Sequence, residues 1–128
     1  MTDDDRPIVM VTGSRSWRRG GVVKAKLRAL NPKLVMHGGA RGADELAQKA
    51  CDELGIATYV LEPLWAIHGK AAGVKRNEAL LAGEPDVVLA FWDGSSPGTG
   101  HAIKAARRRG IRVELVQEPT PPAGLWTE

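Results

Sequence analysis

Five short apolar runs, separated by segments with helical spacing, constrain this chain more than any other feature of its sequence. The runs are rich in Val, Ile and Leu, and they predict strands at residues 8–12, 34–37, 56–61, 86–92 and 111–116. The first run, IVMVT at 8–12, is continuously apolar and rich in β-branched residues, which is typical of a strand that is buried on both faces. The sequence therefore predicts a parallel five-stranded sheet.

Between these runs, apolar residues recur three or four positions apart, which predicts helices. The clearest helix is expected at 43–54, where an apolar stripe runs along one face and Gly55 stops the helix. Further helices are expected at 22–30, 74–82 and 101–109, whereas 62–73 is expected to be an irregular connection.

Strands that alternate with helices predict a sheet covered on both faces, and right-handed crossovers favour the strand order 3-2-1-4-5. We therefore expect an α/β fold, a single Rossmann-like three-layer domain over residues 1–117. The segment 118–128 holds three prolines and is expected to be an extended or disordered tail.

Composition narrows the class of protein. The chain has 128 residues, which is one domain's worth, and a formal net charge of +3. That charge suits phosphate-bearing partners but lacks the dense basic stripe of a DNA-binding protein, so nucleic acid is disfavoured as a partner. The single cysteine, Cys51, fits a reducing cytoplasm. The acidic start does not resemble a secretory signal, and no apolar run approaches the length of a membrane span.

Three glycine-containing segments, 13–17, 37–44 and 93–101, follow strands whose carboxyl ends meet at one edge of the predicted sheet. The chain would reverse direction between the first and fourth strands, and such a switch point opens a crevice at this edge. Glycine lets backbone N–H groups approach a ligand, and the N-termini of helices favour anions. Arginine matches the geometry of phosphate. Together these segments predict an anion pocket.

The residues expected to bind the ligand are the glycines, hydroxyl side chains and cations of these segments, with Arg76 neutralising charge and Trp17 or Trp65 contacting a base. The expected ligand-binding set is Gly13, Ser14, Arg15, Trp17, Gly38, Gly39, Arg41, Gly42, Arg76, Asn77, Ser95, Gly98 and Thr99. Neither a GxGxxG sequence after the first strand nor a GxxxxGK[ST] sequence is present. No histidine spacing indicates a metal site, and no cofactor or metal is expected.

Four of these segments, VTGSRSW, HGGARGADELA, AGVKRNEALL and FWDGSSPGTGHAI, occur in the order seen in a known family. They resemble the YspA-like branch of the SLOG superfamily, which groups SMF/DprA proteins with the Lonely Guy proteins. The resemblance spans Ile8 to Val116. It implies a Rossmannoid fold, a site for nucleotides or nucleotide-derived ligands, a cytoplasmic location and a homodimer or higher homo-oligomer. Many such proteins are encoded by bacteria and their phages.

The resemblance to Lonely Guy enzymes, which cut N-glycosidic bonds with a PGGxGTxxE motif, fails at one position. Pro97-Gly98-Thr99 resembles the phosphate-binding part, but Ala102 stands where the motif has glutamate. An alanine cannot act as an acid or base. We therefore favour a binder of a mononucleotide or ADP-ribose-like molecule that acts as a sensor or sequestering protein.

Two alternatives stay open. A hydrolase of an N-glycosidic or phosphate bond would need Asp44 or Asp93 as a relocated catalytic carboxylate. Asp44 could equally favour the start of its helix, and Asp93 could hold its own loop by a side-chain turn. The third alternative is single-stranded nucleic-acid binding, which the modest charge and the lack of an aromatic-lined basic groove disfavour.

Overall fold

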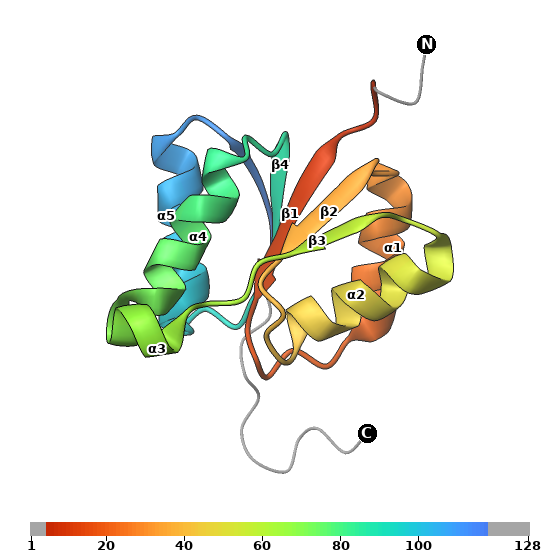
Figure 1. Ribbon diagram of the computed structural model, residues 1–128. Coiled ribbons are helices and arrows are strands. Elements are labelled where there is room, and N and C mark those ends of the chain that lie inside the picture. The colour runs from red at the N-terminus through yellow and green to blue at the C-terminus, as the bar shows by residue number, and fades with distance from the viewer. Residues whose placement is uncertain (1–4, 118–128) are drawn as a thin grey trace.

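The computed structural model describes residues 5–117. Its helices and strands alternate along the chain (Figure 1). In chain order they are β1 (Ile8–Gly13), α1 (Gly20–Leu30), β2 (Leu34–His37), α2 (Ala43–Leu54), β3 (Thr58–Val60), α3 (Trp65–His68), the 3-10 helix η2 (Gly69–Ala71), α4 (Ala72–Ala82), β4 (Val87–Trp92), α5 (Pro97–Arg108) and β5 (Arg112–Gln117). The five strands are parallel in the order β3-β2-β1-β4-β5, which confirms the predicted fold and topology.

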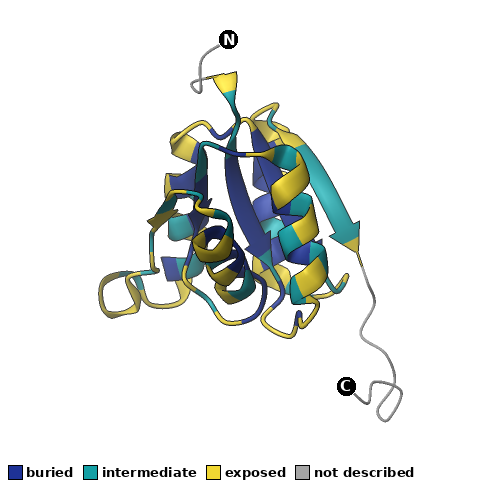
Figure 2. Cartoon of the chain, turned by 90° about the vertical axis from the view of Figure 1, so that its right-hand side faces the viewer, coloured by how far each residue is buried: buried dark blue, intermediate teal, exposed yellow. Residues whose placement is uncertain are grey.

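The sheet separates two helical layers, with α1 and α2 on one face and α3, α4 and α5 on the other (Figure 1). One core cluster joins β1, β2 and β4 to α1 and α2, and it includes Leu27, Ala47 and Phe91. The other joins the opposite face of the strands to α4 and α5 through Leu81 and Ala106. The central strands are almost wholly buried, whereas the edge strand β5 is only partly covered (Figure 2).

The buried position of Cys51 follows from the apolar stripe of α2. Burial, and then the neighbouring Asp52 carboxylate, raise the pKa of the Cys51 thiol to about 11. The thiolate is the reactive form of cysteine, so Cys51 is a packing residue with little reactivity.

The bounds of several predicted elements differ from the structure by one or two residues, and the prediction was wrong by more than that in two places. Helix α5 begins at Pro97, not at residue 101, because a proline is well suited to the first turn of a helix. Of residues 62–73, only 62–64 are irregular, whereas the rest form α3, η2 and the start of α4. Gly69, the first residue of η2, has φ +55°. The prediction for the tail at 118–128, and with it the end of the domain, lies outside the described residues.

The crossing from one helical layer to the other takes place at the carboxyl edge of the sheet. After β3 the chain crosses this edge to reach α3 on the opposite face (Figure 1). The pairing of β1 with β4 continues one residue past the end of β1, because the Ser14 amide donates to the Phe91 carbonyl oxygen at 2.9 Å. The connection after β3 therefore lies across the switch point of the sheet.

Gly13, the last residue of β1, offers a test of how tightly this edge is packed. A Cβ on Gly13 would overlap the Ala43 Cβ and lie 2.7 Å from the Phe91 carbonyl oxygen. We expect Gly13→Ala to lower the free energy of unfolding by about 1–3 kcal/mol, because buried backbone and α2 would have to move. Urea unfolding followed by tryptophan fluorescence measures the change.

The matched control is Gly21→Ala in α1, where a Cβ would have no neighbour within 4 Å. This change is expected to be neutral or to stabilise by up to about 1 kcal/mol, since alanine favours helix more than glycine does. Equal effects at the two positions would contradict the described packing at the end of β1.

Candidate functional site

A cleft of about 430 Å³ opens at the carboxyl edge of the sheet. Its walls come from the loops after β1, β2 and β3 and from one residue each of α3 and α4. The lining residues are Arg15, Gly38, Gly39, Ala40, Arg41, Glu62, Pro63, Trp65 and Arg76. Three guanidinium groups therefore face one concave site in the part of the chain that the structure describes.

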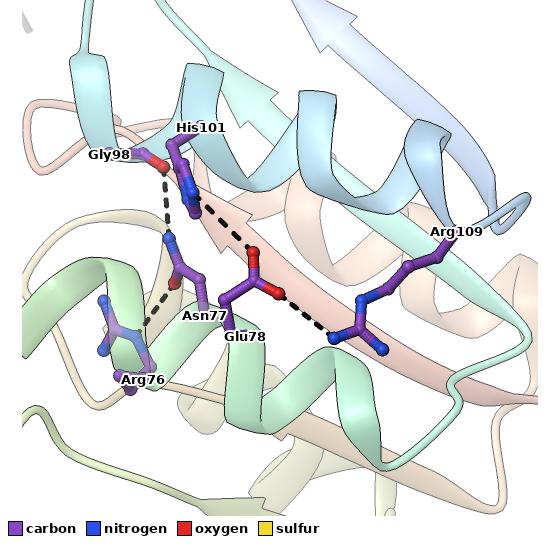
Figure 3. Close-up of polar contacts among 6 residues, drawn as sticks. All are labelled: Arg76, Asn77, Glu78, Gly98, His101 and Arg109. Carbon is purple, nitrogen blue, oxygen red and sulfur yellow. Dashed lines mark hydrogen bonds and ion pairs between the residues drawn. The ribbon is translucent and has the colours of Figure 1, made fainter.

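Arg76 is held in place from both sides. Its Nη1 donates to the Gly38 carbonyl oxygen at 3.1 Å, and its Nε donates to Asn77 Oδ1 at 3.0 Å. Asn77 in turn donates from Nδ2 to the Gly98 carbonyl oxygen at 3.3 Å in the first turn of α5 (Figure 3). A Cβ on Gly38 would overlap the Arg76 guanidinium, so this placement of the Arg76 side chain requires a glycine at position 38.

The helices α4 and α5 are tied together beside this contact. Glu78 lies between the two helices, with Oε2 3.1 Å from Arg109 Nη2 and Oε1 3.8 Å from His101 Nε2 (Figure 3). These pairs are partly exposed and so contribute little to stability. The position of α4 is set by buried side chains such as Leu81, which pack in one core cluster with Ala102 and Ala106 of α5. Arg76 therefore projects from a helix whose position is fixed.

The side chain of Asp44 holds the loop after β2 through hydrogen bonds to its backbone. It lies in the first turn of α2 and is only 5% exposed. Its Oδ2 accepts hydrogen bonds from the Gly38 amide at 3.0 Å and the Ala40 amide at 3.3 Å, while Oδ1 has no hydrogen-bond partner. Burial raises the pKa of Asp44, and the nearby His37 and Arg76 and the two amides only partly oppose that rise.

His37 completes this support. Its Nδ1 accepts from the Gly39 amide at 3.0 Å, so its Nε2 carries the proton and donates to Gln48 Oε1 at 2.7 Å. The imidazole thus satisfies the turn after β2. Together, Asp44 and His37 take up the amides of residues 38, 39 and 40, and these amides are not available to a ligand.

The loop after β4 is also satisfied internally. Asp93 Oδ1 accepts from the amides of Ser95 at 2.9 Å and Ser96 at 2.8 Å, and Oδ2 accepts from the Ser96 hydroxyl at 2.9 Å. Ser14 Oγ accepts from the Asp93 amide at 3.0 Å. Burial alone would raise the pKa of Asp93, but these hydrogen bonds outweigh it and hold that pKa at about 2.

The structure brings together some of the expected ligand-binding residues and not others. Five of them line the cleft: Arg15, Gly38, Gly39, Arg41 and Arg76. Eight do not: Gly13, Ser14, Trp17, Gly42, Asn77, Ser95, Gly98 and Thr99. Neither Asp44 nor Asp93 is among the lining residues. The predicted pocket at the three glycine-rich loops is thus a cleft centred on the loop after β2.

Several of the eight have structural positions instead. Trp17 is 6% exposed and packs against Phe91 with ring centroids 5.4 Å apart, so little of its surface is left for contact with a base. Ser14 is buried, and its Oγ accepts a hydrogen bond from the Asp93 amide in the loop after β4. Gly42 has φ +79°, and a Cβ there would lie 2.5 Å from the Arg15 carbonyl oxygen, so glycine lets the β1 and β2 loops touch.

The cleft is also lined by residues that are absent from the expected ligand-binding set. Ala40, Glu62 and Pro63 line it, and so does Trp65, which was expected only as one of two base contacts. Glu62 follows the third predicted strand, whose carboxyl end must point to the same edge as the others. That rule could have identified Glu62 as a candidate, had the connection after β3 not been treated as irregular.

The electrostatics of the cleft favour an anion. The side chains of Arg15 and Arg41 are exposed and form no hydrogen bond or ion pair with the other residues in the range 5–117. Burial, opposed by the Asp44 charge and aided by Arg15, lowers the pKa of Arg76, but a guanidinium stays protonated at any physiological pH. Among residues 5–117, no three His, Cys, Asp or Glu side chains gather where they could hold a metal ion.

The fold and the cleft define a Rossmann-like domain with a cationic site at the switch point of its sheet. A family model described as the YspA, cpYpsA-related SLOG family matches residues 7–68. The Gene 61 protein of Mycobacterium phage D29 is 36% identical over 115 residues, which cover 82% of this chain and 92% of that protein. The chain belongs to the YspA-related SLOG family, and membership suggests a nucleotide-related ligand.

The name of the phage protein states no activity. Within residues 5–117, none of the helices combines the length and the apolar character that a membrane crossing requires.

Asp44 gives the site a predictable pH dependence. Because its pKa is raised above the ordinary 3.8, the folded protein holds this proton more tightly than the unfolded chain does. Ionisation of Asp44 therefore lowers stability as pH rises from about 3.8 through the raised pKa. Asp44→Asn keeps an oxygen for the two amides but cannot ionise, so we expect it to gain stability relative to the wild type across this pH range.

Urea unfolding of both proteins at pH values from 4 to 8 measures the difference, in which the titrations of all other groups largely cancel. A wild type that gains stability relative to Asp44→Asn as pH rises would show that the pKa of Asp44 is lowered, against this account.

Proposed function

We propose that this protein binds a phosphate-bearing nucleotide-type small molecule, a mononucleotide or an ADP-ribose-like compound, and acts as a sensor or sequestering protein. One observation carries the proposal: Arg15, Arg41 and Arg76 line the same cleft, and the first two have no partner among the described residues. Guanidinium groups match phosphate oxygens in planar, paired hydrogen bonds, and three of them supply charge for one or two phosphates.

The rest of the cleft supports the nucleotide class. Its volume of about 430 Å³ lies in the range of small-molecule sites. Trp65 is 51% exposed and lies at the cleft, where its indole offers a stacking surface for a base. The glycines of the β2 loop let the side chains of Arg76 and Glu62 lie close against the backbone at the cleft. Since the amides of that loop are occupied, we assign phosphate binding to the arginines and not to the loop amides.

Removal of one cleft arginine tests this function. Charge-assisted hydrogen bonds contribute about 1.5–3 kcal/mol, which corresponds to a loss of about tenfold to a hundredfold in affinity. We expect Arg15→Ala, Arg41→Ala and Arg76→Ala each to weaken the binding of AMP or ADP-ribose by this factor. Isothermal titration calorimetry with a panel of nucleotides measures the dissociation constants.

The matched control is Arg107→Ala, which removes the same charge from the exposed last turn of α5, away from the cleft. It is expected to change the affinity by less than about twofold, since exposed charges at this distance are screened by salt. Wild-type protein that binds no member of the panel, or equal losses in the cleft and control variants, would contradict the proposal.

A hydrolase of an N-glycosidic or phosphate bond is the second candidate, and one observation favours it. Asp44 is buried with Oδ1 unpartnered and its pKa raised, as is common for catalytic acids and bases. Asp93 is a poor general acid, because a pKa of about 2 leaves it ionised. Chromatography of AMP and ADP-ribose after incubation with the protein would reveal turnover, and turnover that Asp44→Asn abolishes would replace the binder with an enzyme.

We propose in addition that the protein works in the cytoplasm as a homo-oligomer. The single cysteine agrees with a reducing compartment. Large apolar side chains are exposed on β3, α3 and the residue before α3, and a second copy of this chain would cover them: Tyr59, Val60, Leu64 and Ile67.

A further inference from the structure

We infer that Glu62 recognises the sugar of the ligand, and that the ligand is a ribonucleotide with free 2′ and 3′ hydroxyls. This inference rests on the proposed nucleotide site and assigns a role to a cleft residue that phosphate binding does not use. Glu62 is the acidic residue among those that line the cleft in the described part of the chain.

The position of Glu62 is fixed by its backbone. The strand β3 ends at Val60, but its pairing with β2 continues one residue further, because the Leu61 amide donates to the His37 carbonyl oxygen at 3.0 Å. Pro63 then restricts the backbone on the other side. The backbone of Glu62 is therefore held between the end of β3 and Pro63 at the wall of the cleft.

The side chain of Glu62 lies over Gly39. A Cβ on Gly39 would lie 3.2 Å from Glu62 Cγ and 3.3 Å from Glu62 Oε1, and Gly39 has φ +71°. The preceding residue, Gly38, is the one whose carbonyl oxygen holds the Arg76 guanidinium. The carboxylate and the phosphate-binding cation thus lie at adjacent residues of one loop.

The Glu62 carboxylate is not used to neutralise the arginines. It forms no hydrogen bond or ion pair with any residue in the range 5–117, although three guanidinium groups line the same cleft. An unpaired carboxylate repels a phosphate and accepts hydrogen bonds from neighbouring donors. The group it contacts must therefore be a hydrogen-bond donor close to the phosphate.

The ribose diol fits this requirement. In a nucleotide the sugar follows the phosphate directly, and its two adjacent hydroxyls can donate to the two oxygens of one carboxylate. Acidic side chains bind the ribose hydroxyl in this way in dinucleotide sites of Rossmann folds. An amino group on the base is the other donor that a nucleotide offers. Comparison of AMP with 2′-deoxy-AMP, which lacks one hydroxyl, and with IMP, which lacks the amino group, distinguishes the ribose diol from the base.

Calorimetric titrations of AMP, 2′-deoxy-AMP and IMP into the wild type and Glu62→Ala test the inference. We expect the wild type to bind AMP about tenfold more tightly than 2′-deoxy-AMP, and IMP as tightly as AMP. In Glu62→Ala, AMP and 2′-deoxy-AMP should bind within about twofold of each other. Pyrophosphate, which has no sugar, should bind to the variant at least as tightly as to the wild type.

Glu45→Ala is the control, because Glu45 is an exposed carboxylate of the first turn of α2 that does not line the cleft. It should keep the preference for AMP over 2′-deoxy-AMP. Thermal unfolding of Glu62→Ala should match the wild type, since Glu62 is exposed.

The outcomes separate the two proposals. Arginine-dependent binding of AMP and 2′-deoxy-AMP with equal affinity would overturn the role of Glu62 and leave the nucleotide site intact. A wild type that distinguishes AMP from IMP, with the difference lost in Glu62→Ala, would overturn it in favour of contact with the base. A wild type that binds no nucleotide would overturn both.

Discussion

The buried carboxylate of Asp44 holds the part of the structure on which the candidate site depends. It fixes the amides of Gly38 and Ala40, and the loop so formed presents the Gly38 carbonyl oxygen to Arg76. Burying a carboxylate is costly unless it accepts hydrogen bonds, and here two backbone amides partly compensate. The same contacts join α2 on one face of the sheet to α4 on the other, so the cleft and the packing of the domain are linked.

The topology of the sheet explains why the cleft lies where it does. The strand order reverses between β1 and β4, and the chain after β3 must cross this edge to reach α3. That crossing brings Glu62, Pro63 and Trp65 to the loops after β1 and β2. Cations from three separate segments and one aromatic wall then meet in a single site, as ligand sites at switch points generally do.

The fold could be predicted from the sequence because its signals are local. Continuous apolar runs indicate buried parallel strands, and handedness leaves few orders for them. The helices within residues 62–73 were not predicted because Gly69 and Gly73 interrupt the helical pattern, although Gly73 lies in the first turn of α4.

The cleft arginines Arg15 and Arg41 were predicted from their positions after strands. By contrast, the amides and hydroxyls near Gly38, Ser14 and Ser95 were assigned to a ligand, whereas buried side chains such as Asp44 and Asp93 already satisfy several of them. Such pairings depend on three-dimensional contacts that spacing along the chain does not reveal.

The central claim is that the cleft holds a phosphate-bearing nucleotide. Mass spectrometry of the purified protein, first under native and then under denaturing conditions, tests it without a choice of ligand. The account predicts a bound small molecule in the native spectrum that is released on denaturation with the mass of a nucleotide, or, if none is retained, the same mass shift after incubation with a nucleotide panel. Native protein of unshifted mass, with no shift and no thermal stabilisation by any nucleotide, would contradict it.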